Sequence, residues 1–532
     1  MEDLALLLAA AAAGHALAHR SRLPAVPCLL VAGVALSLIR PPSRTALEET
    51  LALGVALLVF IAGLELDIRR LGAQRRAALR VGILQFAAVG TCGLAAASLL
   101  GFGPAEAAYV ALALAASSTL VCVRLLQRRQ QLFEPFGRLV IGVLLLQDAL
   151  VVLLVPFAPA LGGAWTDATA PAAAVAALGL AGLGVRRWLA PLFLRVADEE
   201  ELLVLGALAV LFAFMGAGAA LRLPLVVGAF VAGVSLSPFP VEEVVRVELS
   251  PIGDFFTAVF FVALGAVIGV PTPDEALRAG ALAIVVLLAT PLLVTVLAER
   301  SGFSARSAIE AGLMLSQASE ISLVVGLSGV WAGRLSDSTF TVLAMVTGGT
   351  MLVTPFLASD RVARGLTRLH PARWMRPPAV AAAGGHVVLI GCGSTGSRLV
   401  DLLLTQGREA LVVDEDPAVL AALRETGVAA VRGDASDPAV LSRAGVDRAS
   451  VIVSTVHRPR RNEALLREVG GRVPVLVRVF DEEEARWVEA RGGRPIVTSE
   501  AAAAAFLAWY EGTVRALPRA REDERGGSGT PG

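Results

Sequence analysis

Residues 137–156 read GRLVIGVLLLQDALVVLLVP, an apolar run with a single carboxylate inside it. A helix of this length can cross the ~30 Å hydrocarbon core of a bilayer. Asp148 follows Arg138 by ten residues, which is about 15 Å along such a helix and therefore near mid-membrane. Ionisable side chains at that depth are costly and are functional by default. The carboxyl group can exchange a proton for a monovalent cation; the alternative is a structural carboxylate satisfied inside a helix bundle.

The composition of the whole chain agrees with a membrane location. The chain has 532 residues, of which 56% are hydrophobic and 17% charged, whereas a soluble domain has about 25% charged residues. A wholly soluble enzyme is therefore excluded. The formal net charge is zero, so no nucleic-acid partner is predicted. The four cysteines are scattered along the chain, so neither a disulfide framework nor a structural metal site is predicted.

Similar apolar segments recur up to about residue 357 and predict a polytopic α-helical domain over residues 1–358. We place thirteen spans at 3–18, 24–39, 49–66, 79–100, 106–126, 139–157, 171–185, 201–221, 223–237, 252–269, 277–298, 308–331 and 338–357. Seventeen arginines follow odd-numbered spans and five follow even-numbered ones. The positive-inside rule then predicts an external N-terminus and a cytoplasmic C-terminal part.

Two of these spans carry polar residues at their centres. Glu320 lies in LSQASEISLVV (315–325), midway between Arg306 and Arg334, and Ser118 and Thr119 lie at a comparable depth in the fifth span. Small hydroxyl residues can also serve helix packing. Spans five and twelve are seven apart, however, so their orientations are opposite. Interrupted helices in corresponding positions of two inverted halves are typical of transporters.

From residue 359 the composition changes. An arginine-rich linker over 359–385 suits an anionic membrane surface or is a solvated connector. Residues 386–516 then alternate strand-like and helix-like segments, which predicts an α/β domain with a parallel sheet and right-handed crossovers. The expected strands are 387–391, 410–414, 429–433, 450–454, 473–479 and 495–499. Residues 517–532 have the composition of a disordered tail.

A glycine-rich loop follows the first of these strands. Gly391, Gly393, Ser394, Thr395 and Gly396 belong to a G-x-G-x-x-G motif, and Asp414 ends the second strand 18 residues later. The glycines allow a pyrophosphate to approach the helix N-terminus, and the acid can accept hydrogen bonds from a ribose. We expect NAD(H) or AMP as a regulatory nucleotide; the alternative is a Rossmann-like domain that binds nothing. No second catalytic domain follows, so an oxidoreductase is not expected.

The membrane half resembles the monovalent cation:proton antiporter-2 family, most closely its Kef-type potassium efflux branch. The resemblance is carried by LVFIAGLELD (58–67), ALAASSTLVCVRLLQ (113–127), GRLVIGVLLLQD (137–148), VGAFVAGVSLS (227–237), FFVALGAVI (260–268) and EAGLMLSQASEISLVVG (310–326). It implies crossed discontinuous helices, with Asp148 as the cation and proton site. Gln147, Ser118, Thr119 and Glu320 would supply oxygens or orient that site. It further implies a homodimer in the inner membrane whose core bundle moves as an elevator.

The soluble half resembles the regulator of K⁺ conductance (RCK, or TrkA N-terminal) domain. The likeness is carried by VRGDASDPAVLSRAGVDRASVIVSTV (431–456) and VRVFDEEEARWVEARGGRPIVTSE (477–500), and it implies that Asp434 lies near the adenine end of the nucleotide. Two departures from the family pattern stand out. Residues 279–298 contain no basic side chain, and Arg246 and Ser250 stand where the Kef branch has acids. Glutathione gating is therefore not implied.

These features together predict a K⁺:H⁺ antiporter, with K⁺ favoured over Na⁺, that works by alternating access under the control of a nucleotide. The alternative is a ligand-gated, K⁺ channel-like efflux protein, and a third reading is a transporter-like sensor that has lost transport. Glu65 and Asp67 at the end of the third span are either functional acids or an interfacial helix end.

Overall fold

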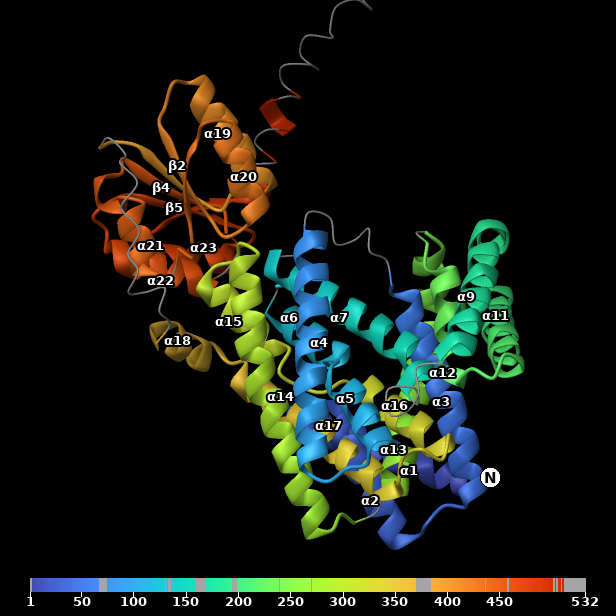
Figure 1. The fold of residues 1–532 in the computed structure, drawn as a ribbon. Helices are drawn as coiled ribbons and strands as arrows, with labels where there is room; N and C mark the ends of the chain where they lie inside the picture. The colour runs from blue at the N-terminus through green and yellow to red at the C-terminus, as the bar shows by residue number, and fades with distance from the viewer. Residues whose placement is uncertain are drawn as a thin grey trace, which may run out of the picture. The chain divides into compact units, whose positions relative to one another are not determined.

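The computed structural model describes residues 2–66, 74–129, 131–132, 135–158, 168–193, 199–238, 240–268, 270–369, 384–435, 437–456, 459–500, 503, 506–508 and 510. Asp67, most of the predicted linker and the predicted tail lie outside these residues. The chain divides into two units, Met1–Arg373 and Trp374–Gly532 (Figure 1).

The first unit is helical, and each of the thirteen predicted segments lies, to within a few residues at its ends, in a helix or in a pair of consecutive helices. The helices are α1 (Glu2–Ser21), α2 (Ala25–Ile39), α3 (Arg44–Leu64), α4 (Arg75–Leu99), α5 (Pro104–Leu114), α6 (Thr119–Arg128), α7 (Pro135–Leu154), α9 (Thr169–Gly184), α10 (Ala190–Phe193), α11 (Glu200–Ala220), α12 (Leu225–Leu236), α13 (Val241–Ile268), α14 (Pro273–Arg300), α15 (Ala305–Met314), α16 (Glu320–Trp331), α17 (Asp337–Leu357) and α18 (Asp360–Leu369). Within the described residues, nine helical segments are long and apolar enough to cross a membrane. The count of thirteen crossings stays a prediction.

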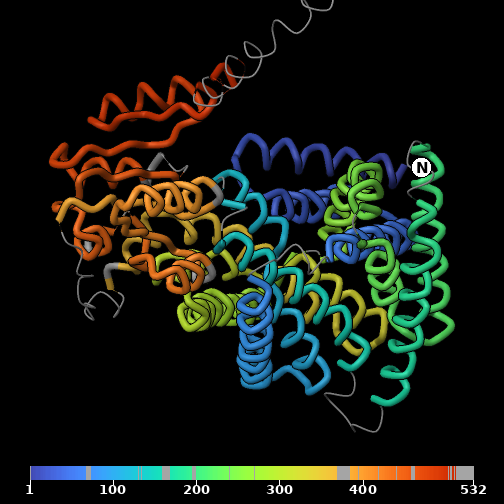
Figure 2. Tube along the Cα trace, turned by 90° about the horizontal axis from the view of Figure 1, so that it is seen from above, coloured from blue at the N-terminus to red at the C-terminus, as the bar shows by residue number. Residues whose placement is uncertain are grey.

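Packing sorts these helices into two groups. Helices α1–α3 pack with α11–α13, and α4–α7 pack with α14–α17; α9 and α11 lie at one end of the unit and α4 and α14 toward the other (Figures 1 and 2). Glycines allow the closest approaches in the first group. A Cβ atom at Gly233 of α12 would overlap the carbonyl oxygen of Phe60 in α3, and one at Gly265 of α13 would overlap that of Leu30 in α2. Small residues at such contacts are typical of membrane helix pairs.

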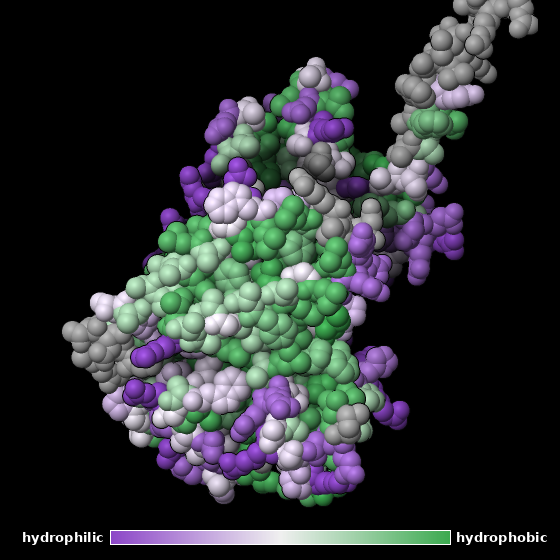
Figure 3. All heavy atoms as spheres, turned by 90° about the vertical axis from the view of Figure 1, so that its right-hand side faces the viewer, coloured by the Kyte–Doolittle hydropathy of each residue, from purple (hydrophilic) through white to green (hydrophobic). Residues whose placement is uncertain are grey.

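The outer face formed by α9 and α11 is apolar. A broad band of hydrophobic side chains covers this side of the molecule, with hydrophilic groups below it (Figure 3). Exposed residues on these helices include Leu180, Leu183, Leu205 and Phe212. A contiguous exposed apolar surface of this kind suits contact with lipid or with another membrane helix.

The second unit contains a six-stranded sheet. Its strands are β1 (Val387–Ile390), β2 (Ala410–Asp414), β3 (Ala429–Arg432), β4 (Val451–Ser454), β5 (Val475–Val479) and β6 (Arg494–Val497), in the order β3-β2-β1-β4-β5-β6. All neighbouring strands are parallel, which confirms the predicted parallel sheet. The helices between them are α19 (Ser394–Thr405), α20 (Pro417–Glu425), α21 (Pro438–Arg443), α22 (Pro459–Val469) and α23 (Glu482–Glu489).

Candidate functional site

The fifth and twelfth predicted spans are each broken at the centre. The first is interrupted between α5 and α6, where Ser118 caps α6 by accepting a hydrogen bond from Val121 N at 3.3 Å. The second is interrupted between α15 and α16, where Ser319 caps α16 by accepting from Ile321 N at 3.1 Å. Serine is a preferred N-cap because its hydroxyl satisfies an amide that has no partner within the helix. Two helices therefore start inside the unit, and both point their positive N-terminal ends inward.

The two breaks cross each other, and neutral donors satisfy the carbonyl groups at the end of α15. The Ser117 hydroxyl donates to the Leu315 carbonyl at 2.7 Å. The carbonyl of Met314 accepts from the Cys122 thiol at 3.1 Å and from the Gln317 amide at 3.4 Å. Unwound backbone in a membrane must find such partners, since no water is available there. The crossing explains how α14 can lack a basic residue near the breaks.

Two carboxylates lie at the crossing. Thr119, the first residue of α6, donates its hydroxyl to Oδ2 of Asp148 in α7 at 3.0 Å. Glu320, the first residue of α16, accepts from Leu120 N of α6 at 3.3 Å. Both carboxylates are 5% exposed. Oδ1 of Asp148 and Oε2 of Glu320 have no hydrogen-bond partner among the described residues.

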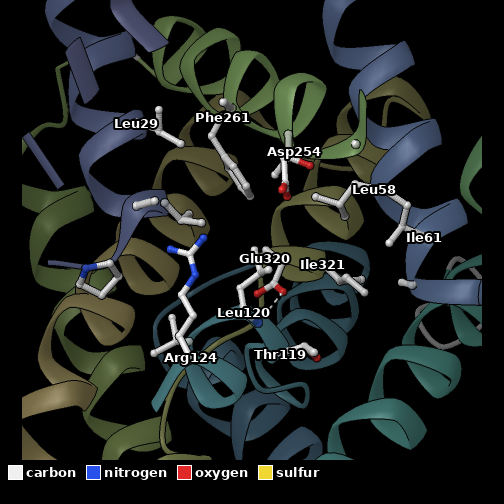
Figure 4. A pocket seen from close by; sticks show the side chains of 18 of the residues that line it. Leu29, Leu58, Ile61, Thr119, Leu120, Arg124, Asp254, Phe261, Glu320 and Ile321 are labelled. Carbon is white, nitrogen blue, oxygen red and sulfur yellow. Dashed lines mark hydrogen bonds between the residues drawn. The ribbon is translucent and has the colours of Figure 1, made fainter. Parts of the chain in front are cut away.

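Asp148, Glu320 and Thr119 border a cavity of about 330 Å³ between the two groups of helices. Figure 4 shows the cavity from close by, with Asp254 of α13 and Arg124 of α6 also pointing into it. Two buried acids with oxygens free to bind a ligand, next to a hydroxyl and open to a cavity, form a site that fits a monovalent cation or a proton.

Three lining residues were missed or undervalued by the sequence reasoning. Asp254 lies inside the predicted tenth span, where any acid is a signal of function. Arg124 was counted only as evidence for topology. Glu65 lines the same cavity as Asp148, which favours a functional acid over a simple helix end.

The side chain of Gln147 has different hydrogen-bond partners from that of Asp148. Its Oε1 accepts from Ser117 N at 3.0 Å, and its Nε2 donates to the side chain of Gln85 in α4. Gln85 in turn donates to the Ala115 carbonyl at 3.4 Å. The two glutamines therefore hold the unwound stretch of the first broken helix in place. Gln85 was not predicted, although a glutamine in the middle of an apolar span was visible in the sequence.

The glycine loop joins β1 to the N-terminus of α19. Gly391 has φ +83°, and a Cβ atom at Gly396 would overlap the carbonyl oxygen of Gly391. Nothing lies within 4 Å of the Cβ position of Gly393, so this glycine leaves room beside the helix N-terminus. Ser394 is the first residue of α19 and Thr395 the second. The loop thus has both the tight turn and the open space that a phosphate group needs.

Acids and a base surround this loop. Asp414 ends β2 and accepts from Cys392 N at 2.6 Å and from Asp416 N at 2.8 Å. Burial raises the pKa of Asp414 above its ordinary value, and burial together with the Asp414 charge raises the pKa of the Cys392 thiol to about 11. Arg478, from β5, donates to the hydroxyl of Thr395 at 3.1 Å. A guanidinium at a helix N-terminus adds positive charge where an anion would sit.

Asp434 is placed just after β3 and is 3% exposed. It follows the strand next to the one that Asp414 ends. The carboxyl ends of parallel strands share one edge of the sheet, so both acids belong to the edge that carries the glycine loop.

Comparison with known proteins matches both units. The family model described as "Sodium/hydrogen exchanger, transmembrane" matches residues 4–359, and the TrkA-N domain model matches residues 387–499. The chain is 28% identical over 437 residues to the glutathione-regulated potassium-efflux system protein KefC of Shigella flexneri, covering 80% of this chain and 70% of that protein. It is also 28% identical over 422 residues to the protein of the same name from an Enterobacter species, covering 77% and 67%.

Two solved structures are similar to parts of the chain. The TrkA-N domain of the inner membrane protein ybaL from Escherichia coli is 21% identical, with a TM-score of 0.23, covering 24% of this chain and 98% of that one. The GsuK channel bound to NAD is 19% identical, with a TM-score of 0.21, covering 42% and 41%. The chain is a multi-pass membrane protein that belongs to the sodium/hydrogen exchanger family and carries a C-terminal TrkA-N domain.

Proposed function

We propose that the protein exchanges a monovalent cation, K⁺ in preference to Na⁺, for protons across the inner membrane. The observation that carries this proposal is the pair of buried carboxylates at the helix crossing, each with one oxygen that has no hydrogen-bond partner in the described part of the chain. A cation and a proton compete for the same oxygens, so only one of them occupies the site at a time. The preference for K⁺ rests on the potassium-efflux relatives.

Residues around the pair have distinct roles in this exchange. Asp148 binds the cation or the proton, and Glu320 adds a second charge and a second oxygen. Thr119 donates to Asp148 and can turn its hydroxyl oxygen toward a cation. Gln147 holds the Ser117 amide and so positions the unwound backbone. Ser118 is the cap of α6, and its carbonyl accepts a hydrogen bond from the Gln317 amide at 3.5 Å.

The division into two groups of helices supports alternating access. Both carboxylates belong to the group formed by α4–α7 and α14–α17, while the facing wall of the cavity comes from α1–α3 and α13. A sliding of the first group against the second would carry the site from one side of the membrane to the other. Four arginines line the cavity, namely Arg22, Arg124, Arg128 and Arg246, and the positive-inside rule assigns such residues to the cytoplasmic side. These arginines support a conformation that is open toward the cytoplasm. In the homodimeric elevator that the resemblance implies, the first group would be the moving part and the second the static part.

The TrkA-N domain is proposed to bind a nucleotide, NAD(H) or AMP, that biases these conformations. The residues present fit such a ligand, because the space beside Gly393 is open and Arg478 lies against the N-terminus of α19. Gly391, Gly396 and the α19 amides would hold the phosphate groups, and Asp414 would accept from a ribose hydroxyl. A bound nucleotide would supply binding energy and charge. Titration of the full-length protein with NADH, NAD⁺, AMP and ATP tests this, and an absence of heat with all four would contradict it.

The transport test uses proteoliposomes that contain a pH dye. A proton gradient is imposed, K⁺ or Na⁺ is added, and dequenching is recorded for the wild type and for Asp148→Asn. Dequenching with one cation that is lost in a folded Asp148→Asn protein supports exchange and identifies the ion. Exchange that persists in this variant would refute the role of Asp148. Cation current without proton movement would favour a channel instead.

A further inference from the structure

Arg124 places a permanent positive charge inside the cavity that leads to the carboxylates. It lies on α6, five residues after Thr119, and lines the same cavity as Asp148 and Glu320. Figure 4 shows its side chain extended from α6 into the cavity. In the described part of the chain, no ion pair holds this guanidinium. An arginine stays protonated at every physiological pH and has several rotatable bonds, so a change of rotamer can move its charge within the cavity.

The other basic groups that line the cavity are less well placed to reach the buried acids. Arg246 is held by Glu242 at 2.9 Å. Arg128 is one further turn along α6, away from the crossing. His15 lies in α1 and Arg22 just after it, so both are on the opposite wall of the cavity. Arg124 is therefore the basic residue nearest along its helix to the site.

Asp254 offers this guanidinium a second partner. It lies on α13, in the other group of helices, and Figure 4 shows its carboxyl group pointing into the cavity. No ion pair is formed by Asp254 within the described residues. Among the described residues, the cavity thus has the buried acids Asp148 and Glu320 on one wall, Glu65 and Asp254 on the other, and the guanidinium of Arg124 extending into the space between them.

We propose that Arg124 is a tethered cation that competes with the transported cation for Asp148 and Glu320, and that Asp254 receives its guanidinium once the transported cation is bound. The proposal rests on the proposed exchange function. Two buried carboxylates without a counter-ion are costly, and a guanidinium that approaches them lowers this cost while the site is empty. An incoming cation must displace it. Asp254 makes that displacement easier, because the released guanidinium is paired again.

Competition between Arg124 and the transported cation should change the cation KM by a measurable factor. The apparent dissociation constant equals the intrinsic one divided by the fraction of time that the site is available. A guanidinium that occupies the carboxylates for two thirds to nine tenths of the time raises KM by about threefold to tenfold. Loss of Arg124 should lower the cation KM by the same factor, whereas loss of Asp254 should raise it.

The test measures the cation KM of exchange in proteoliposomes for Arg124→Gln, Arg124→Lys, Asp254→Asn and the Arg124→Gln/Asp254→Asn double variant. Arg128→Gln, one turn further along α6, is the matched control. We expect KM to fall in Arg124→Gln, to stay near the wild-type value in Arg124→Lys and Arg128→Gln, and to rise in Asp254→Asn. In the double variant KM should equal that of Arg124→Gln, because Asp254 acts only through the guanidinium.

Three results would overturn the proposal. The first is an unchanged KM in Arg124→Gln. The second is loss of exchange in that variant although the protein is folded, as judged by its elution in size-exclusion chromatography. The third is an effect of Asp254→Asn on KM that is equally large in the wild type and in the Arg124→Gln variant. The same liposomes report on the exchange function separately. If Asp148→Asn still exchanges, the proposed function fails, whereas a dead Asp148→Asn beside an unchanged Arg124→Gln rejects only the tethered cation.

Discussion

Replacement of Glu320 by glutamine should weaken cation binding strongly while it leaves the fold intact. The amide has the same shape as the carboxyl group, and its oxygen can still accept from Leu120 N, which contacts Oε1 at 3.3 Å. What is lost is one negative charge beside Asp148. Two unit charges about 5 Å apart interact by about 3 kcal/mol at an effective dielectric constant of about 20. That energy corresponds to about a hundredfold increase in the cation KM.

The assay is cation-driven dequenching of a pH dye in proteoliposomes, recorded over a range of K⁺ concentrations. Glu106→Gln is the matched control. Glu106 also lies in the first turn of a helix, α5, where it accepts hydrogen bonds from Ser336 and Thr339 at 2.7 and 2.9 Å. It is not among the residues that line the cavity, so its KM should match the wild type. A KM for Glu320→Gln within twofold of the wild type would refute the reasoning, because it would mean that Glu320 adds no charge to the site.

Three further predictions concern packing and the nucleotide loop. Gly233→Ala forces a methyl group against the Phe60 carbonyl and should cost about 1–3 kcal/mol, seen as a lower thermal midpoint in detergent; Gly216→Ala, where the added Cβ meets nothing within 4 Å, should leave that midpoint unchanged. Cys392, whose thiol pKa is about 11, should react slowly with iodoacetamide at pH 8, with a rate by mass spectrometry that rises up to about pH 11, since only the thiolate reacts. Arg478→Gln should weaken nucleotide binding at least tenfold by calorimetry, because a hydrogen bond to a charged group is worth about 1.5–3 kcal/mol; an unchanged affinity would place the phosphate groups elsewhere.

The sequence was most informative where polar residues interrupt an apolar pattern. Asp148, Glu320 and the Ser118–Thr119 pair stand out because the bilayer penalises such residues, and the structure brings them together at one crossing. The parallel sheet was equally accessible, since hydrophobic strands alternate with helices and a glycine loop follows the first strand. Both results rest on local patterns that do not require knowledge of contacts.

Partners distant in the chain could not be predicted in this way. Gln147 was expected to supply an oxygen or to orient the site, and the structure engages both ends of its amide, one of them with Gln85 in another helix. Asp254 and Arg124 were each visible as charges within predicted spans, yet the wall of the cavity to which each belongs depends on how the two groups of helices pack. A one-dimensional pattern gives the depth of a residue in the membrane, whereas its neighbours follow from the packing.

The central part of α14, residues 279–298, contains no basic side chain, and the hydrogen bonds at the helix crossing show what this means for the charge of the site. A crossing of two broken helices brings together two N-terminal ends, which favour negative charge, and two C-terminal ends, which favour positive charge. Here Glu320 contacts the N-terminal end of α6, while the hydroxyl of Ser117, the thiol of Cys122 and the amide of Gln317 satisfy the carbonyls at the end of α15. Near the end of α5, the Ser322 hydroxyl donates to the Ala113 carbonyl and the Gln85 amide donates to the Ala115 carbonyl. Since these donors are neutral, they compensate no carboxylate charge. The negative charge of the ionised pair is therefore left for mobile cations to balance, namely the transported ion, the proton and, in our proposal, the guanidinium of Arg124 on α6.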